Sequence, residues 1–188
     1  MDAQENDHEL IHKFLDEDDD SALRGLFSRY AGQVHRFLLR FVGSAEAEDL
    51  TQETFVKVWR HLHRVDPQRN FRAWLFSIAR NTGRDWLRKH QSIPFSDFDD
   101  LDGGNTILDH LEDSADLPDA VFATKAAVEN IRCALKELPL AARDVVLLHH
   151  EAELTFQEIA EIREEPLNTV KSRYRRAVIE LKKRLSSI

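Results

Sequence analysis

Apolar residues recur three and four positions apart in several stretches of the chain, which is the spacing of one face of an α-helix. One stretch covers residues 23–41 and stops at Gly43, where a C-terminal cap is expected. Ser44 is placed to cap a further helix, and a loop follows that helix at residues 63–70. The same spacing then predicts a helix from Phe71. No stretch alternates as a β-strand does, so the predicted fold class is all-α.

The C-terminal pattern predicts a helix-turn-helix preceded by two more helices. The two earlier helices are expected at residues 123–138 and 141–150, with Pro139 breaking the chain between them. Thr155 and Glu158 then form a capping box that starts a short helix. This helix turns three apolar residues inward: Ile159, Ala160 and Ile162.

Pro166 opens the second helix of the pair, and this helix has two distinct faces. Its inward stripe is Leu167, Val170, Tyr174, Ala177, Val178, Leu181 and Leu185. Its outer face carries Asn168, Lys171, Ser172, Arg175 and Arg176. These outer side chains can reach base edges and neutralise phosphate, as a helix in the major groove must. A basic outer face is also typical of a solvated helix, but the capped short helix and tight connection beside it favour DNA binding.

The connection between these two helices lacks glycine. Helix-turn-helix turns commonly place glycine at a left-handed position, whereas this turn consists of Arg163, Glu164 and Glu165. A residue with a side chain costs about 1 kcal/mol in that conformation. We therefore expect a turn that is strained or slightly rearranged.

Charge is distributed unevenly along the chain. The formal net charge of −8 arises from two acidic segments, residues 1–20 and 91–124, which flank a basic block at residues 21–90. Residues 92–119 contain two adjacent glycines, two prolines and scattered aspartates, a composition that predicts a flexible acidic linker. The chain is therefore predicted to form two small helical domains joined by this linker. The basic block says more about partners than the overall charge does.

Composition disfavours several classes of protein. No early stretch resembles a signal peptide. A membrane span needs about 18 apolar residues, and no apolar run approaches that length. We therefore expect a cytoplasmic location without membrane insertion. The single Cys133 excludes an internal disulfide and paired-cysteine zinc sites, and its apolar neighbours suggest an inert core thiol. The nine histidines show no metal-binding motif. We expect neither a metal nor a cofactor.

Polar residues of the first domain gather on two helices. Asp49, Gln52, Glu53, Lys57 and Arg60 share one side of their helix. The apolar residues expected to turn inward are Leu50, Phe55, Val58 and Trp59. In the next helix aromatic residues interleave with polar positions expected to be exposed, which are Arg72, Arg80, Asn81, Arg84, Arg88 and Lys89. Rings and cations together suit a single-stranded nucleic acid, although core packing is the alternative for Trp74 and Trp86.

Three motifs of the chain resemble the extracytoplasmic-function (ECF) sigma factors of bacterial RNA polymerase. They are DLTQETF at residues 49–55, FRAWLFSIARN at residues 71–81 and TVKSRYRRA at residues 169–177. The resemblance covers residues 21–90 and 121–185, with the motifs in the family's order. Three motifs in register are far more specific than any one of them.

The resemblance implies a role in promoter recognition. In the family, the first domain binds the clamp helices of core RNA polymerase and captures the melted −10 element, about 10 base pairs upstream of the start. The second domain reads the duplex −35 element, about 35 base pairs upstream, beside the polymerase flap. The linker threads the channel that later holds RNA. An anti-sigma factor is expected to occlude these surfaces, and catalysis belongs to the polymerase.

On the matching positions, the resemblance assigns residues to three surfaces. The core polymerase-binding set is Asp49, Gln52, Glu53 and Phe55. The −10 element set is Arg64, Asn70, Arg80, Asn81, Arg84, Arg88 and Lys89, with residues 63–70 and Asn81 at the site of a flipped base. The −35 element set is Asn168, Lys171, Ser172, Arg175 and Arg176. The implied domains are an acidic tail and helix start (1–20), a region 2 domain (21–90), the linker (91–120) and a region 4 domain (121–188).

The chain departs from the family pattern near the helix-turn-helix. Family members usually have arginine at the position of His149, glycine at Glu153 and Glu164, and an apolar residue at Glu165. A missing arginine and added carboxylates beside DNA should weaken phosphate contact. We therefore expect a weaker −35 interaction or an altered sequence preference.

Two other functions fit parts of the sequence. A stand-alone helix-turn-helix regulator explains the C-terminal domain but leaves the motifs at residues 49–55 and 71–81 without a role. An enzyme such as a nuclease needs clustered acids or histidines for a metal, whereas the acids here concentrate in the tail and linker. The main prediction is an ECF sigma factor without catalytic residues.

Overall fold

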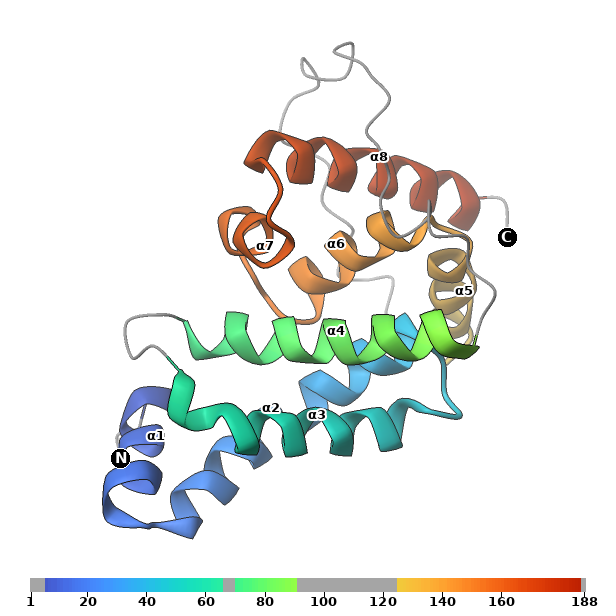
Figure 1. The fold of residues 1–188 in the computed structure, drawn as a ribbon. Coiled ribbons are helices and arrows are strands. Elements are labelled where there is room, and N and C mark those ends of the chain that lie inside the picture. The colour runs from blue at the N-terminus through green and yellow to red at the C-terminus, as the bar shows by residue number, and fades with distance from the viewer. Residues whose placement is uncertain (1–5, 66–69, 91–124, 187–188) are drawn as a thin grey trace, which may run out of the picture. The chain divides into compact units, whose positions relative to one another are not determined.

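The computed structural model describes residues 6–65, 70–90 and 125–186, and within these ranges the chain is helical without any strand (Figure 1). The elements are α1 (Asp7–Glu17), α2 (Asp20–Phe41), α3 (Ala47–His61), the short 3₁₀ helix η1 (Leu62–Arg64), α4 (Phe71–His90), α5 (Lys125–Lys136), α6 (Leu140–His150), α7 (Phe156–Arg163) and α8 (Leu167–Leu185). The predicted all-α fold class is confirmed. The chain divides into two compact units, Met1–Leu87 and Arg88–Ile188. The predicted linker lies outside the described residues.

A separate helix, α1, lies within residues 1–20, for which the sequence predicts an acidic tail and the start of the first helix. It begins with a capping box. The backbone N–H of Glu9 donates a hydrogen bond to the Asn6 side chain, and the backbone N–H of Asn6 donates one to the Glu9 carboxylate, both at 2.9 Å. Asp7 accepts hydrogen bonds from Arg29 and from the Tyr30 hydroxyl, both on α2. Local capping and this contact therefore order a segment rich in acidic residues.

The turn between α2 and α3 agrees only in part with the prediction. Gly43 has φ of 124°, a conformation that glycine adopts readily, and it follows the end of α2 as expected. The predicted capping role of Ser44 is wrong, because α3 begins only after Glu46, which makes no side-chain capping hydrogen bond. A turn at residues 44–46 separates Ser44 from the first turn of the helix, whose free N–H groups a cap must reach.

Phenylalanine and leucine side chains build the core of the first unit. Phe37 stacks on Phe41 with ring centroids 5.4 Å apart, and meets Phe76 of α4 edge-on at 5.6 Å. A Cβ atom on Gly83 would lie 2.6 Å from the Phe41 ring, so the glycine permits a close approach of α4 to α2. Lys57 on α3 donates a hydrogen bond to Thr82 on α4 at 3.0 Å, and Figure 1 shows these two helices side by side.

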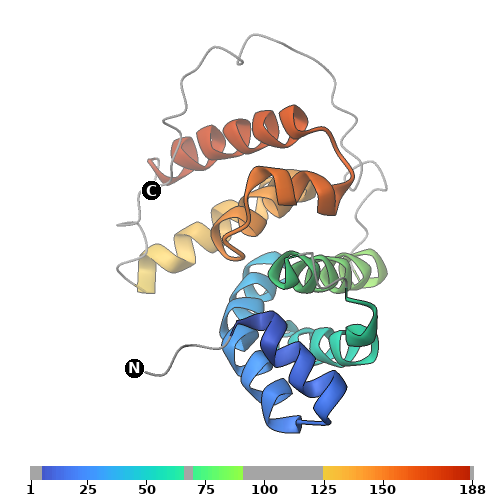
Figure 2. The same cartoon turned by 90° about the vertical axis from the view of Figure 1, so that its left-hand side faces the viewer.

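Helix α8 organises the second unit by packing against α5, α6 and α7 (Figure 2). Its predicted inward stripe is confirmed, with Val170, Tyr174, Ala177, Val178 and Leu181 buried and with Leu167 and Leu185 half-buried. Arg143 of α6 donates hydrogen bonds to the backbone carbonyls of Leu135 and Lys136 at 2.9 and 2.6 Å. These carbonyls at the end of α5 lack partners within their own helix. Burial lowers the pKa of Arg143 to about 10.

The expectation of a core thiol at Cys133 is wrong, because this side chain is exposed. The next two residues of α5, Ala134 and Leu135, are buried. Successive residues of a helix point about 100° apart, so apolar neighbours along the sequence do not place Cys133 on the buried face. None of the described helices is long and apolar enough to cross a membrane.

Candidate functional site

A polar face on α3 forms the first candidate surface. Asp49, Gln52 and Glu53 are all exposed, as their spacing predicts. Glu53 forms an ion pair with Lys57 one turn later, with 2.7 Å between Oε1 and Nζ. The exposed N-terminal half of α3 thus offers two carboxylates and an amide to a partner.

Two large apolar side chains continue this face toward the end of α3. Val56 is 44% exposed and Trp59 is 55% exposed. The expectation that Trp59 turns inward is wrong, because it follows Val56 by three positions and Gln52 by seven, a spacing that keeps all three on one side. The inward side of α3 consists instead of Ala47, Leu50, Thr54 and Val58.

Phe55 occupies a different place from the other residues of the predicted polymerase-binding set. Its side chain is half-buried, and its ring lies 4.7 Å from the ring of Phe27 on α2. This contact anchors α3 on α2. The polar residues of the set therefore stand in the exposed face, whereas Phe55 supports it from one side.

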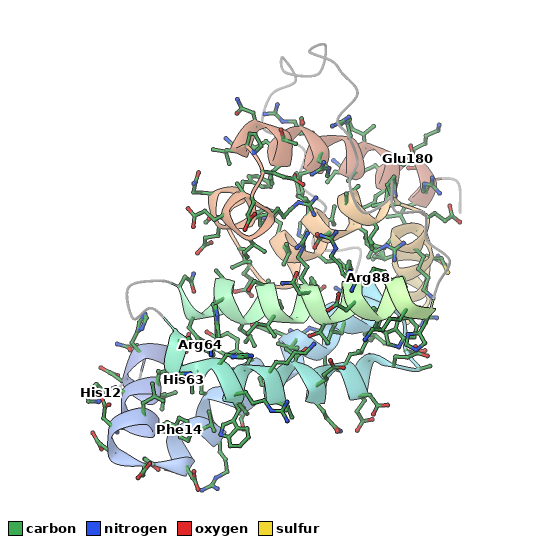
Figure 3. The ribbon with its side chains drawn as sticks, viewed as in Figure 1. His12, Phe14, His63, Arg64, Arg88 and Glu180 are labelled. Carbon is green, nitrogen blue, oxygen red and sulfur yellow. The ribbon has the colours of Figure 1, made fainter. Side chains whose placement is uncertain are left out.

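The residues expected to contact melted DNA spread along the length of α4. Arg64 in η1 and Arg88 near the end of α4 are exposed and lie toward opposite ends of this helix in Figure 3. With 20 residues, α4 is about 30 Å long. Asn81 and Lys89 are exposed as well. A surface of this length can follow several nucleotides of an extended strand.

The remaining residues of that set have structural contacts of their own. The Asn70 side chain accepts a hydrogen bond from the backbone N–H of Arg72 at 3.0 Å, and so caps the start of α4. Arg84 is half-buried. Residues 66–69 of the predicted base-binding loop lie outside the described residues.

The expectation that Arg80 is exposed is wrong, since this residue is only 6% exposed. It follows Phe76 by four residues and precedes Gly83 by three, and both of these face the core. Its Nη1 atom lies 3.3 Å from Oδ1 of Asn81, to which it donates a hydrogen bond. Arg80 is thus placed to orient the exposed Asn81 side chain from beneath.

The aromatic residues of α4 divide between the core and its edge. Phe71 and Phe76 are buried, and Trp74 and Trp86 are half-buried. The Trp74 ring lies 5.8 Å from that of Phe71. Packing against neighbouring residues therefore covers part of each tryptophan side chain.

The helix-turn-helix has the predicted local structure. Thr155 and Glu158 form the capping box, with the backbone N–H of Thr155 donating to the Glu158 carboxylate at 2.8 Å. Glu164 ends α7 in the left-handed conformation, with φ of 56° and ψ of 38°. Glu153, the other position at which the family usually has glycine, has φ of 53°. Glutamate therefore occupies two backbone conformations that favour glycine.

The outer face of α8 carries the residues expected to contact duplex DNA. Asn168, Lys171 and Arg176 are exposed, and Ser172 and Arg175 are half-buried. Ser172 donates a hydrogen bond to the Thr169 carbonyl at 3.0 Å, which fixes its hydroxyl close to the helix. The face thus combines amide and hydroxyl groups with cations, the mixture that base edges and phosphates require.

Four charged side chains link the turn to the core of the second unit. Arg163 donates one hydrogen bond to Asp144 of α6 and another, at 2.7 Å, to Oε1 of Glu165. The second carboxylate oxygen of Glu165 accepts a hydrogen bond from Arg173 of α8. We call Asp144, Arg163, Glu165 and Arg173 the turn network. The sequence predicts Glu165 to be an added negative charge beside DNA, whereas its carboxylate is paired with Arg163 and Arg173.

Charge pairing within the turn network outweighs the cost of burial. Burial alone would raise the pKa of Glu165, but hydrogen bonds and attraction from Arg163 and Arg173 lower it below its usual value. Burial likewise opposes the charge of Arg163, and the carboxylates of Asp144 and Glu165 raise its pKa. These shifts favour the ionised forms of Glu165 and Arg163.

His149 lies in an aromatic group between α6, α7 and α8. Its ring stacks on Phe156 with centroids 4.5 Å apart and meets Tyr174 edge-on at 5.0 Å. Its Nδ1 atom is 2.8 Å from the carbonyl oxygen of Leu154. Where family members usually carry an arginine, this chain has a side chain that packs helices together.

Comparison with known families identifies both halves of the chain. The model of sigma-70 region 2 matches residues 26–93, and a model of sigma-70 region 4 matches residues 128–181. The ECF RNA polymerase sigma factor RpoE of Cereibacter sphaeroides is 34% identical over 182 residues, which cover 94% of this chain and 93% of that protein. The ECF RNA polymerase sigma factor SigW of Bacillus subtilis is 28% identical over 172 residues, covering 90% and 92%.

Solved structures with the same fold include CnrH in complex with the cytosolic domain of CnrY, with a TM-score of 0.70, 23% identity and coverage of 96% of this chain and 97% of that one. The sigma factor RpoE from Bartonella quintana, in complex with the anti-sigma factor NepR, has a TM-score of 0.66, 24% identity and coverage of 87% and 96%. Identity above 30% over nearly the full length, with both region models in order, settles the family. The chain belongs to the extracytoplasmic-function family of RNA polymerase sigma factors.

Proposed function

We propose that this sigma factor binds core RNA polymerase and directs promoter-specific initiation by recognising and melting promoter DNA. One observation carries the proposal: the exposed polar face of α3 and a capped helix-turn-helix occur in one chain, each inside a segment that matches its own sigma region. A stand-alone helix-turn-helix regulator would need only the second. The polymerase supplies the catalysis, and the chain acts in the bacterial cytoplasm as a specificity subunit.

The polymerase-binding surface is the exposed side of α3. Asp49, Gln52 and Glu53 offer polar contacts at one end, and Val56 and Trp59 offer apolar area at the other. Phe55 holds the helix on α2. Exposed tryptophans beside polar groups are typical of the residues that carry most of the energy of an interface.

The −10 surface consists of Arg64, Asn70, Asn81, Arg84, Arg88 and Lys89, with Arg80 orienting Asn81. The cations follow the backbone of the melted strand, and the amides bind an extruded base. In the second domain, Asn168, Lys171, Ser172, Arg175 and Arg176 read the −35 element from the major groove. We retain the domain boundaries 21–90 and 121–188 for these functions, with residues 91–120 as the linker.

An anti-sigma factor is the expected regulator. CnrH and the Bartonella RpoE, which share this fold, were both solved in complex with partner proteins, the cytosolic domain of CnrY and the anti-sigma factor NepR. A comparable partner of this chain would cover the polymerase-binding or DNA-binding surface until a signal releases it. The polymerase flap would contact the second domain in the active complex.

Transcription with purified components tests the proposed function. The chain is mixed with core RNA polymerase and a pool of promoter fragments, and transcripts made with and without it are sequenced. New start sites that share a two-part upstream motif are expected. Absence of such transcripts, with an active polymerase and a chain that binds DNA alone, would favour the stand-alone regulator.

A matched pair of variants tests the α3 surface. Asp49→Ala with Gln52→Ala should weaken polymerase binding by about 1–3 kcal/mol while the helical content measured by circular dichroism stays unchanged. The control replaces Glu17 on α1 and Ser28 on α2, an exposed carboxylate and an exposed hydroxyl of the first unit outside α3, with alanine. Unchanged binding in the α3 variant would remove this surface from the proposal.

A further inference from the structure

Glu165 of the turn network stands at a position where this family usually has an apolar residue. The ion pairs of the network join three helices, because Asp144 lies on α6, Arg163 at the end of α7 and Arg173 on α8. Glu165 stands in the connection and contacts both arginines. A single carboxylate therefore ties the recognition helix α8 to the helix that precedes it.

We propose that Glu165 is a positioning residue for −35 recognition, which sets the sequence specificity of α8 by holding Arg163 and Arg173. This inference rests on the proposed role of α8 in reading the −35 element. It gives the carboxylate two tasks. One is to fix the orientation of α8, and the other is to keep two cations away from DNA.

Burial and geometry support the first task. The side chains of Asp144 and Arg163 are each 2% exposed, that of Arg173 is 6% exposed and that of Glu165 is 25% exposed. Apolar contacts are non-directional, whereas charge-assisted hydrogen bonds from both oxygens of one carboxylate constrain direction as well as distance. Arg173 lies on the buried side of α8, whose outer face carries Lys171 and Arg176, so anchoring Arg173 holds the helix that presents them.

The charge balance supports the second task. The turn network contains two carboxylates and two guanidinium groups, so it adds no net charge near the proposed DNA-binding face. Loss of the Glu165 charge would leave Arg163 and Arg173 without this acceptor and would make one additional positive charge available to phosphate. Phosphate contacts raise affinity for every sequence alike and therefore lower discrimination.

Glu165→Gln tests the proposal, with Glu164→Gln as its matched control. Both variants remove one negative charge from the same turn, but Glu164 is exposed and outside the turn network. Each holoenzyme, assembled from the full chain and core polymerase, is titrated with two duplexes. One carries the −35 element that the wild-type holoenzyme selects from randomised DNA, and the other carries a scrambled upstream element. The readout is the dissociation constant for the scrambled duplex divided by that for the selected duplex. A lower ratio means weaker discrimination between the two sequences.

We expect Glu164→Gln to preserve the wild-type ratio and Glu165→Gln to lower it about tenfold, mainly through tighter binding to the scrambled duplex and weaker binding to the selected one. Equal ratios for the two variants would overturn the inference while leaving the −35 role of α8 intact. A wild-type holoenzyme that does not distinguish the two duplexes would overturn both.

Arg173→Gln provides a second variant that breaks the same contact from the other side. It removes the cation that Glu165→Gln releases, so the ratio should fall through weaker binding to the selected duplex, without a gain on the scrambled one. A purely structural role would lower the stability of the second unit and leave the ratio of the folded protein unchanged. That result for Arg173→Gln, with thermal unfolding measured in parallel, would also overturn the proposal.

Discussion

Gly83 is the residue whose replacement has the clearest expected cost. The added Cβ atom of Gly83→Ala would lie 2.6 Å from one carbon of the Phe41 ring and 3.0 Å from the next, inside a core of packed rings. The variant should lower the free energy of unfolding by about 1–3 kcal/mol, because the ring must shift out of a filled space. Urea unfolding followed by tryptophan fluorescence measures this, since all three tryptophans lie in the first unit.

Gly25 provides the control for this substitution. It lies in α2, and a Cβ atom built on it meets nothing within 4 Å. Gly25→Ala should raise stability by about 0.5–1 kcal/mol, since alanine loses less backbone entropy in a helix. Equal effects of the two substitutions would show that α4 does not approach Phe41 as closely as described.

Glu164 tests whether the turn of the helix-turn-helix stores strain. Its φ of 56° is unfavourable for a residue with a side chain, so Glu164→Gly should stabilise the second unit by about 1 kcal/mol. Glu161→Gly, one turn earlier in α7 and also exposed, should destabilise it by a similar amount. Hydrogen exchange of the α7 and α8 amides measures both effects. If Glu164→Gly failed to slow the exchange of these amides, the result would argue against a strained turn.

At the scale of elements, α3 presents an apolar end whose role can be separated from stability. Trp59→Ala should weaken the binding of core polymerase by about 2 kcal/mol and leave the fold intact, because the side chain is 55% exposed. Leu15→Ala on α1 is the control, since Leu15 is 41% exposed but belongs to another helix. Competition for core polymerase between variant and wild-type chains measures the loss. The same small loss in both variants would mean that Trp59 is a solvated residue.

The turn network gives the packing of α6, α7 and α8 a dependence on pH. Arg163 and Arg173 lower the pKa of Glu165 below its usual value of 4.5. The ionised carboxylate is therefore more stable in the folded than in the unfolded state. The resulting stability is fully present above the unfolded pKa and is lost as the pH falls through the lower folded pKa. Glu165→Gln should therefore flatten the acid limb of the stability curve of the second unit. Parallel curves for variant and wild type would contradict the pairing.

The helices follow from the sequence pattern better than the surfaces do. Apolar spacing predicts α8 with its inward stripe, and Thr155 with Glu158 predicts the start of α7, because both depend on residues within a turn or two. Spacing from Gln52 and Val56 places Trp59 on the exposed side of α3, although its residue type favours burial. Arg80 is a cation, a residue type that is usually exposed, but its position places it on the buried face of α4.

Contacts between distant residues account for what could not be predicted. The pairing of Asp144 with Arg163 spans 19 positions of the chain, and no local pattern specifies it. The same holds for Asp7 and Tyr30, whose contact orders α1 across 23 positions. The outward residues of α8 were predictable because one periodic element carries them all, whereas the turn network needs three helices to be in place.

At the scale of the whole molecule, the chain comprises two compact units, each with a core of its own and each containing most of one sigma region. Asn81 of the proposed −10 surface lies in the first unit and Arg176 of the proposed −35 surface lies in the second, whereas Arg88 and Lys89 at the end of α4 fall just past the unit boundary. Substitutions that share no partner and no packed core add in free energy. The proposed function therefore predicts that substitutions on the two surfaces have additive effects on the free energy of promoter binding.

The combination is tested with Asn81→Ala in the first unit and Arg176→Ala in the second, singly and together. Each single variant should weaken binding of the holoenzyme to its selected promoter by about 1–3 kcal/mol if the side chain reads a base. The double variant should equal the sum to within about 0.5 kcal/mol, because the side chains are exposed on separate units. Scrambling the −35 element should abolish the effect of Arg176→Ala and preserve that of Asn81→Ala. An equal loss from Arg176→Ala on every upstream sequence would reassign this residue to phosphate contact, and a large departure from additivity would mean that melting at one element depends on reading the other.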